Sequence, residues 1–369
     1  MEKTKVLYFV DRFLVGGIQT LIVNILKNIN KNEIQIDFLI LDDGNKYILE
    51  DDLREKGYNV YKLNNIWIRK PTDYYKYAKA LDSFFSKHHD YKVVHLHGSS
   101  KNYMVLKYAK KYNIPMRIAH SHNIGFQTKS RLKTIVGDLL KNKLKKYATD
   151  YFACSKKAGE WLFGKKDVTI INNGINIDEF TFNKKIREEY RDKLGICKNE
   201  LLFGHVGRFT NQKNHLFLID IFKEIHSNNQ KAKLLLVGSG ELEEEIKNKV
   251  SNYELTEAVI FAGFQTNVSD YFQAMDVFLF PSKYEGLGIV LLEAQAAFLP
   301  CFASKDVVPN DVKITELVSF ISLNETPKEW AKIISSSNLN RRNCTKDILK
   351  HEYSIKQTTD YLTKIYQTK

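Results

Sequence analysis

The sequence is poor in the residues that build disulfide-stapled, fibrous or membrane-spanning proteins. Its 369 residues include only four cysteines and six prolines. Because the cysteines lie at least 43 residues apart, with no C-x-x-C pair, neither a disulfide framework nor a zinc knuckle is indicated. No run approaches about 18 apolar residues, and charges interrupt the first apolar segment before an export signal is complete. The sequence therefore predicts a globular protein that stays in the cytoplasm.

The chain does hold enough apolar residues for two buried cores. Its composition is 43% apolar and 27% charged, and its length favours two folding units at roughly 150 residues each. Short β-rich segments alternate with helical patterns from end to end, which is typical of α/β domains with parallel sheets. This alternation breaks in VTIINNGINIDEF. We therefore predict one domain over residues 1–172, a second over 173–354, and a helix over 355–369 that packs on the first domain.

The predicted strands form one series in each half of the chain. The segments are KVLYFV, IQIDFLI, YKVVHLH, PMRIAHSH and DYFACS in the first half, and LLFGHVGR, KLLLVGSG, AVIFAGF, DVFLFPS, PCFAS and LVSFIS in the second. In parallel α/β sheets, ligands bind at the carboxyl ends of the strands. The loops that follow these segments are therefore where functional residues are expected.

An excess of positive charge lies entirely in the first half. The formal net charge is +13, and residues 1–170 hold 31 Lys and Arg against 17 Asp and Glu. Residues 129–147 are typical of a basic amphipathic helix, with apolar residues at helical spacing. Either the apolar stripe covers its own domain, or the helix docks on an anionic membrane through Lys129, Arg131, Lys133, Lys141, Lys143, Lys145 and Lys146. No nucleic acid is expected as a partner, because no recognised binding motif accompanies the lysines.

The most informative stretch is FPSKYEGLGIVLLEAQA, residues 280–296. A strand ends at Pro281, a loop follows, and a helix begins near Gly288, so that free backbone N–H groups suit a phosphate. Glu285 and Glu293 stand eight residues apart. Eight residues at helical rise span roughly 12 Å, comparable to the distance between the sugar and the ribose of a nucleotide-diphospho-sugar. Both acids also fit ordinary surface positions.

The loops after other strands of the second half add cations and glycines. HVGRFTNQKNH, residues 205–215, places Arg208 and Lys213 where two cations can neutralise a diphosphate, although ordinary loop charges fit the pattern too. VGSGELEEEI contributes Gly238 but lacks the third glycine of the dinucleotide fingerprint, so a nicotinamide or flavin cofactor is not indicated. FAGF contributes Gly263, in a loop where a nucleobase fits.

Taken together, these motifs resemble the retaining glycosyltransferases of family 4, and in particular their capsule and exopolysaccharide branch. The resemblance runs over most of the chain, from VDRFLVGGIQTL through RIAHSHN, INNGINIDEF and VGRFTNQKNH to PSKYEGLGIVLLEAQA. It implies the GT-B fold, in which two Rossmann-like domains face each other across a cleft. Asn214 and Phe298 stand where family members usually have glycine, which leaves the local shape of both loops in question.

The resemblance also implies roles for individual residues. Arg208 and Lys213 would contact the donor diphosphate, Glu293 the ribose and Glu285 the donor sugar. Further donor contacts are implied for Gly238 and Gly263 and for the backbone of Gly286, Leu287, Gly288 and Ile289. Gly16 and Gly17 follow the first strand and fit a plain turn equally well, but the resemblance favours a glycine loop bordering donor and acceptor.

Two H-x-H pairs each end a predicted strand: His95 with His97, and His120 with His122. A metal site is not expected there, because no carboxylate or cysteine accompanies either pair at ligand spacing. His95 and His97 are expected to be buried and hydrogen-bonded. The resemblance implies a histidine near the donor sugar, which either His120 or His122 can supply. His122 is preferred because it precedes the polar Asn123.

These observations predict a retaining glycosyltransferase that needs no metal cofactor. It would move a hexose or N-acetylhexosamine from a nucleotide-diphospho-sugar, with UDP expected, to a lipid-linked or polysaccharide acceptor at the inner face of the cell membrane. The sequence has no D-x-D, so a metal-clamped diphosphate lacks its usual residues. A nucleotide-sugar epimerase on the same scaffold and a non-catalytic basic binding protein stay open as alternatives.

Overall fold

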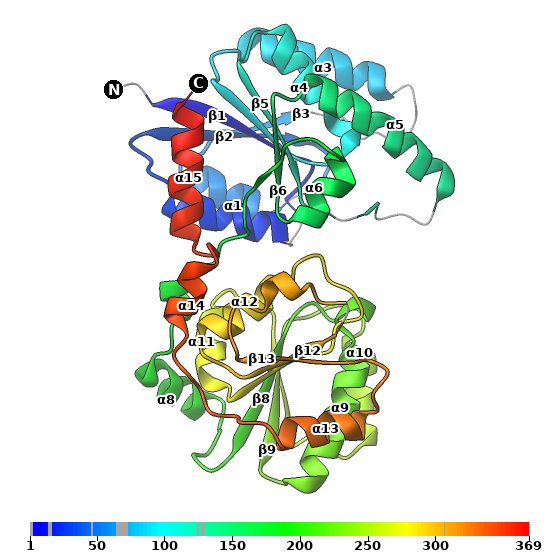
Figure 1. Ribbon diagram of the computed structural model, residues 1–369, viewed down its shortest axis with the longest axis vertical. Coiled ribbons are helices and arrows are strands. Elements are labelled where there is room, and N and C mark those ends of the chain that lie inside the picture. Colours follow the sequence, from blue (N-terminus) through cyan, green and yellow to red (C-terminus); the bar gives the residue numbers. More distant parts are fainter. Residues whose placement is uncertain are drawn as a thin grey trace. The chain divides into compact units, whose positions relative to one another are not determined.

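The chain forms two compact α/β units (Figure 1). The computed structural model describes residues 3–13, 17–45, 47–63, 73–123, 125–126, 130–305 and 307–368. The first unit comprises Met1–Gly174 and Ile355–Lys369, and the second comprises Ile175–Ser354. The division after Gly174 lies two residues beyond the predicted boundary, and the C-terminal helix belongs to the first unit.

A parallel sheet with the order β3-β2-β1-β4-β5-β6-β7 forms the centre of the first unit. Its strands are β1 (Thr4–Val10), β2 (Ile34–Leu41), β3 (Val60–Leu63), β4 (Val93–His97), β5 (Met116–Ser121), β6 (Asp150–Ala153) and β7 (Thr169–Ile170). Its helices are α1 (Gly17–Asn28), α2 (Ile48–Glu55), α3 (Asp73–Lys87), η1 (Ser100–Asn102), α4 (Tyr103–Lys111), α5 (Arg131–Tyr147), α6 (Lys156–Phe163) and α15 (Ile355–Gln367).

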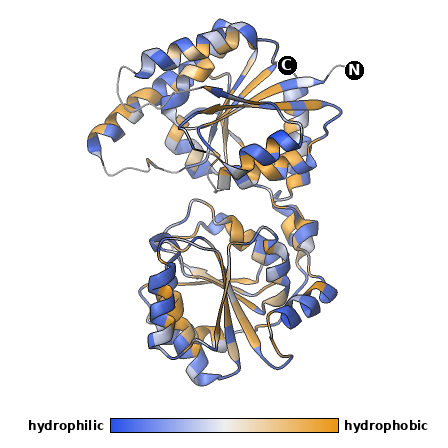
Figure 2. Ribbon diagram, turned by 180° about the vertical axis from the view of Figure 1, so that it is seen from behind, coloured by the Kyte–Doolittle hydropathy of each residue, from blue (hydrophilic) through white to orange (hydrophobic). Residues whose placement is uncertain are grey.

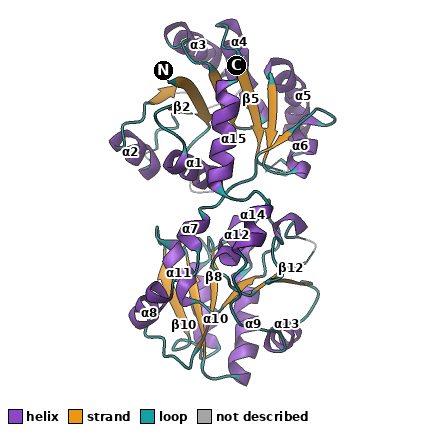
Figure 3. Ribbon diagram, turned by 60° about the vertical axis from the view of Figure 1, so that its left-hand side comes forward, coloured by secondary structure: helices purple, strands orange, loops and turns teal. Residues whose placement is uncertain are grey.

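Helices cover both faces of this sheet (Figure 3). On β1, alternate residues point to opposite faces, so Tyr8 packs toward α1 and α15 while Phe9 packs toward α3 and α4. Burial on both faces explains why the strands appear in the sequence as nearly continuous apolar runs. α15 lies beside α1, and its Leu362 and Tyr366 are fully buried in the same core.

The second unit has a six-stranded parallel sheet with the order β10-β9-β8-β11-β12-β13. Its strands are β8 (Leu201–Val206), β9 (Ala232–Val237), β10 (Val259–Gly263), β11 (Val277–Phe280), β12 (Cys301–Ser304) and β13 (Val318–Ile321). Its helices are α7 (Ile177–Phe180), α8 (Lys184–Lys193), η2 (Asn211–Lys213), α9 (His215–Asn228), α10 (Glu243–Asn252), α11 (Val268–Ala274), α12 (Ile289–Ala296), η3 (Asn310–Val312), α13 (Pro327–Ser335) and α14 (Thr345–Lys350).

Both sheets reverse their strand order near the middle, between β1 and β4 in the first unit and between β8 and β11 in the second. This is the doubly wound arrangement of Rossmann-like folds, and the predicted fold class is confirmed. The loops that leave two neighbouring strands in opposite directions at such a reversal open a crevice for a ligand. In the second unit, these loops contain Arg208, Lys213 and Glu285, and the helix α12 that follows the second loop carries Glu293.

Candidate active site

The loops after β8 and β11 are joined at the reversal point of the second sheet. The backbone N–H of Lys283 donates to the carbonyl of Gln212 over 2.8 Å. The side-chain amide of Asn214 donates to the carbonyl of Pro281 over 3.0 Å. These bonds connect η2, which follows β8, to the segment that leads into α12. Residues more than 65 positions apart in the sequence thus form one continuous site.

Lys213 and Glu285 form an ion pair at the centre of this site. Lys213 Nζ lies 2.7 Å from Glu285 Oε1, and the two side chains are only 17% and 6% exposed. The same Nζ lies 4.7 Å from the ring centroid of Phe280. Lys213 is therefore held by a carboxylate and an aromatic ring together. The structure brings these two predicted site residues into direct contact.

Arg208 lies in the loop after β8, as Lys213 does, but it is not part of the Lys213–Glu285 ion pair. It lies two residues beyond the end of β8 and is exposed. Its carbonyl accepts a hydrogen bond of 2.8 Å from the backbone N–H of Thr210, within the turn that leads to η2. The guanidinium is thus carried by the loop that also carries Lys213.

The start of α12 supplies the predicted backbone donors. Gly288 is the residue before the helix and has φ +82°, a left-handed conformation that glycine adopts without strain. Gly286 is exposed and a β-carbon placed on it would meet no atom within 4 Å, whereas Leu287 is buried in the core. The N–H groups of Gly288 and Ile289 belong to the unpaired first turn of a helix. The strand, loop and helix start thus have the arrangement that the sequence predicts for a phosphate site.

Glu293 lies one turn into α12 and is half-buried. Burial and, to a smaller extent, the nearby Glu179 raise its pKa to about 7, although Lys213 lowers it. Glu179 comes from α7, in the INNGINIDEF segment, and the sequence analysis did not single out this acid as a site residue. The spacing between the two segments gives no signal that they meet. Only the packing of α7 against α12 brings them together.

The raised pKa of Glu293 predicts a pH-dependent stability. The folded chain holds a proton on Glu293 that the unfolded chain releases between pH 4.5, its ordinary pKa, and about 7. The free energy of unfolding should therefore fall as the pH rises through this range, by about 2 kcal/mol after allowing for partial exposure. Glu293→Gln should lose this decline, which thermal melts of both proteins from pH 4.5 to 8 would show. Parallel pH profiles would contradict the assignment.

Gly238 and Gly263 lie at the carboxyl ends of β9 and β10. The N–H of Gly238 donates to the carbonyl of Gly263 over 2.8 Å. A β-carbon on Gly238, whose φ is +140°, would lie 2.1 Å from the carbonyl oxygen of Gly207. The N–H of Phe209 also donates to the carbonyl of Ser239 over 3.0 Å. Gly238 therefore has a packing role that is independent of any ligand, because it lets the loops after β8 and β9 touch.

In the first unit, the two H-x-H pairs form one buried cluster at the ends of β4 and β5. His95 and His97 are buried and hydrogen-bonded, as predicted. His95 bonds to His120 over 3.0 Å and to Tyr366 of α15 over 2.6 Å, and His97 bonds to His122 over 3.0 Å. His120 is 1% exposed, whereas His122 is only partly buried and follows the last residue of β5. Of the two candidates, His122 is thus the one that reaches the surface.

The two rings of the His97–His122 pair share a limited number of N–H groups. Burial lowers the pKa of His122 to about 3 and also lowers that of His97, so both rings are neutral. A neutral imidazole has one N–H and one acceptor nitrogen. The bond between the rings uses one N–H, and the accepting ring keeps its own N–H on its other nitrogen. His97 Nε2 and His122 Nδ1 are both buried without a partner among the described residues, so one of them carries an N–H with no acceptor there.

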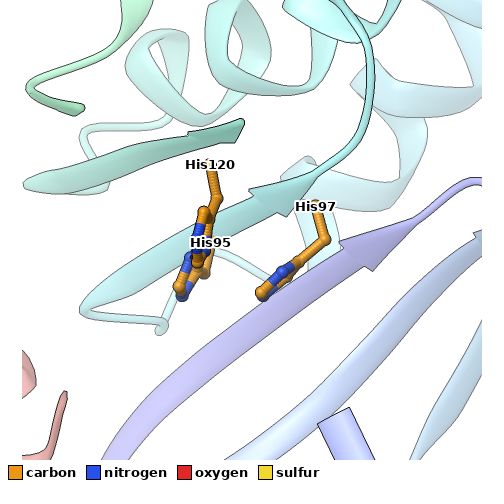
Figure 4. Close-up of side chains that lie close together, drawn as sticks. All are labelled: His95, His97 and His120. Atoms are coloured by element: carbon orange, nitrogen blue, oxygen red, sulfur yellow. The ribbon is translucent and has the colours of Figure 1, made fainter. Parts of the chain in front are cut away.

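The side chains of His95, His97 and His120 hang from β4 and β5 on the same side of the sheet (Figure 4). Their ligand atoms lie within 4.8 Å of one another. However, the ring of His95 stacks on the rings of His97 and His120, at interplanar angles of 25° and 15°. His95 Nε2 and His120 Nδ1 instead face each other in a hydrogen bond of 3.0 Å, whereas metal ligation requires both lone pairs to point at an ion roughly 2.0 Å away. The geometry is that of a hydrogen-bonded cluster.

Among the remaining predicted residues, Gly17 begins α1, while Gly16 and Lys129 lie outside the described residues. The predicted docking cations differ in where they lie. Lys141 is turned inward, with its Nζ donating to the carbonyl of Trp161 over 2.9 Å, and Lys145 is half-buried. The exposed cations of α5 are Arg131, Lys133, Lys143 and Lys146.

The first alternative for this helix, an apolar stripe that covers its own domain, fails over its first half. Of its apolar residues, Leu144 alone is buried, and Leu140 is half-buried. Leu132, Ile135, Val136 and Leu139 are exposed. Among the described residues no helix combines the length and the apolarity that crossing a bilayer requires.

Two Rossmann-like units, one of which has a cation, an acid and a helix start at the reversal point of its sheet, match the architecture expected of a glycosyltransferase. Family models agree. The model for glycosyltransferase family 4 matches residues 15–179, and that for glycosyl transferases group 1 matches residues 186–346. The chain belongs to the family 4 glycosyltransferases, in the branch of capsule and exopolysaccharide biosynthesis.

Similar proteins with known names support this membership. The putative glycosyltransferase EpsF of Bacillus subtilis is 29% identical, over 90% of this chain and 88% of its own. CapH of Staphylococcus aureus, a capsular polysaccharide biosynthesis glycosyltransferase, is 25% identical over 99% of both chains. A UDP-Gal:α-D-GlcNAc-diphosphoundecaprenol α-1,3-galactosyltransferase of Escherichia coli is 27% identical over 79% of both. The crystal structure of Anabaena HepE with UDP and glucose superposes with a TM-score of 0.70 at 18% identity, covering 98% of this chain and 95% of that one.

Proposed function

We propose that the protein transfers a hexose or N-acetylhexosamine from a UDP-sugar to a lipid-linked or polysaccharide acceptor, with retention of the anomeric configuration. The observation that carries this proposal is the ion pair of Lys213 and Glu285 beside the start of α12. The E. coli relative is named for a UDP-sugar donor and an undecaprenyl-linked acceptor, and HepE was crystallised with UDP. Both names support a donor and an acceptor of these classes for this chain.

The chemistry follows from the charge of the leaving group. Departure of the sugar leaves a nucleoside diphosphate with roughly two to three negative charges, and stabilising this developing charge lowers the barrier most. Lys213, Arg208 and the N–H groups at the start of α12 are the donors for it. Because the sequence has no D-x-D, we propose that these groups do so without a metal cofactor. The acceptor hydroxyl then attacks the face of the sugar that the phosphate leaves, and its proton passes to the departing phosphate oxygen.

The carboxylates orient the donor. When the diphosphate engages Lys213, Glu285 is released from its ion pair to accept hydrogen bonds from the sugar hydroxyls. Glu293 accepts hydrogen bonds from the ribose, which favour its charged form despite the raised pKa. We further propose that His122 contacts the donor, because it is the less buried of the two candidate histidines.

The first unit would carry the acceptor and the membrane contact. Its positive excess, together with the exposed cations of α5, favours peripheral contact with anionic lipid. A lipid-linked acceptor would be presented at the same surface, on the cytoplasmic side.

Donor binding followed by transfer tests this function. We expect UDP-sugars to raise the melting temperature in a panel that also contains GDP- and ADP-sugars, because a ligand that binds only the folded chain stabilises it. NMR with the stabilising donor and a lipid-linked acceptor analogue should then show acceptor-dependent loss of the donor, a product with retained configuration, and the same rate in excess EDTA. Conversion of the donor without acceptor would instead indicate an epimerase. Absence of stabilisation by every nucleotide-sugar would contradict the proposal.

A further inference from the structure

The outward side of α5 presents four large apolar side chains to solvent. Leu132, Ile135, Val136 and Leu139 are 72%, 52%, 46% and 64% exposed. Their spacing of three or four residues places them on one side of the helix, and Figure 2 shows hydrophobic residues alternating with hydrophilic ones along α5. We refer to these four residues as the apolar face. Exposed apolar patches of this kind usually mark an interaction surface.

The opposite side of α5 attaches the helix to its unit. Leu144 is buried in the core beside α4, and the carbonyl of Gly137 accepts a hydrogen bond of 3.0 Å from Ser100. Lys141 Nζ lies 4.3 Å from the ring centroid of Trp161 and forms an ion pair of 2.9 Å with Asp138. The helix is therefore fixed with its apolar face outward.

Cations continue and flank the apolar face. Lys143 and Lys146 follow Leu139 by four and seven residues, on the same side of the helix, and both are exposed. Arg131 and Lys133 stand at its first turn and are exposed as well. Asp138 is the only acid of α5. One helix side thus combines an apolar half with a cationic half.

We propose that α5 inserts its apolar face into an anionic bilayer, at the boundary of headgroups and acyl chains, while its exposed cations contact lipid phosphates. This inference rests on the membrane contact proposed above and deepens it from electrostatic docking to insertion. The positive charge around the apolar face favours anionic lipid over a second copy of the chain as the binding partner of this face. A second copy of the chain would bring like charges together around the apolar face, whereas anionic headgroups complement Arg131, Lys133, Lys143 and Lys146.

Insertion and docking differ in their response to salt. Surface charges act through a field that salt screens, and the screening length is roughly 3 Å at 1 M. Burial of apolar side chains is not screened. Binding to vesicles of anionic phosphatidylglycerol and neutral phosphatidylcholine should therefore weaken with salt but persist at 1 M. Binding to pure phosphatidylcholine vesicles should be weaker at low salt, because only the apolar contribution remains.

Paired variants separate the two contributions. Leu132→Ser with Leu139→Ser should weaken binding to the mixed vesicles by roughly 100-fold, at about tenfold or more per buried side chain. Ile333→Ser, at a 39% exposed position on α13, is the matched control and should bind like the wild type.

The charge contribution is tested by Lys143→Gln with Lys146→Gln, which should lower both the binding and its dependence on salt. The matched control, Lys328→Gln with Lys332→Gln, alters two exposed lysines of the second unit and should bind like the wild type.

A reporter on the helix shows insertion directly. In Leu139→Trp, the new indole should shift its emission to the blue on vesicle binding and be quenched by lipids brominated on their acyl chains. Unquenched emission from the bound protein, or wild-type binding by the double serine variant, would overturn insertion. Oligomers that form without lipid and disappear in the serine variant would indicate a second copy as the occupant and would also overturn it.

The test of membrane insertion can fail or succeed independently of the test of sugar transfer. Transfer to a water-soluble acceptor analogue needs no membrane, so the serine variant should retain the wild-type rate in that assay. If this rate is normal while vesicle binding of the wild type is absent, the insertion proposal alone fails. If transfer is absent from the wild type, the proposed function fails whatever the vesicles show.

Discussion

Replacing Lys213 by alanine is expected to reduce sugar transfer by about 10³-fold. Lys213 is the half-buried cation of the candidate donor site, and removing one preorganised donor to a developing negative charge costs roughly 10²–10³ in rate. A full positive charge in a partly buried site places the effect at the upper end of this range. The substitution also leaves the carboxylate of Glu285, whose side chain is only 6% exposed, without its cation and close to the incoming diphosphate.

The measurement is the rate of transfer at saturating acceptor, compared with Lys249→Ala. Lys249 is the matched control, because it also forms a partly buried pair of 2.7 Å with an acid, Asp220, but lies between α10 and α9. We expect Lys249→Ala to transfer sugar at the wild-type rate. Thermal melts of both variants establish that each is folded. A folded Lys213→Ala protein within tenfold of the wild type would exclude the proposed role of this lysine.

The two positions that depart from the family pattern show how far sequence reasoning extends. Asn214 and Phe298 stand where glycine is usual, and the structure gives them φ values of +58° and +61°. Both keep the left-handed backbone that glycine favours. Asparagine adopts it at little cost, while a bulky residue is strained there. The loop shapes are therefore retained, and the departure concerns their energetic cost.

Local sequence patterns predict most strands of the fold, and the strands that they miss are short. All six strands of the second sheet and five of the first were predicted from apolar runs. β3, with a lysine among its four residues, and β7, with only two residues, carry too little apolar sequence to be distinguished from loops. Their places at the edge of the sheet come from pairing with β2 and β6, which no local pattern specifies.

Contacts between distant segments were the least predictable part of the site. The residue types of Lys213, Glu285 and Glu293 were recognisable in the sequence, but the effect of Glu179 on Glu293 depends on how α7 packs. The orientation of α5 could not be predicted from the sequence either. Its periodicity is compatible with an apolar stripe turned inward or outward, and only the three-dimensional structure shows which side is anchored.

Replacing Gly238 by alanine is expected to destabilise the second unit by at least about 3 kcal/mol. The new β-carbon would lie 2.1 Å from the carbonyl oxygen of Gly207, which is backbone and cannot rotate away, and the φ of +140° is itself strained for any other residue. The loops after β8 and β9 would have to separate. At roughly 2–4 °C per kcal/mol for a unit of this size, the melting temperature should fall by about 10 °C.

Gly286→Ala is the matched control, and it separates folding from donor binding. A β-carbon at Gly286 meets no atom within 4 Å in the chain, so this variant should melt with the wild type. Its exposed backbone belongs to the loop proposed to bind the phosphate, so UDP-sugar should stabilise the variant less than it stabilises the wild type. If Gly238→Ala melts with the wild type, the contact between the two loops is not what fixes this glycine. Gly238 would then retain only the donor role that the family resemblance implies.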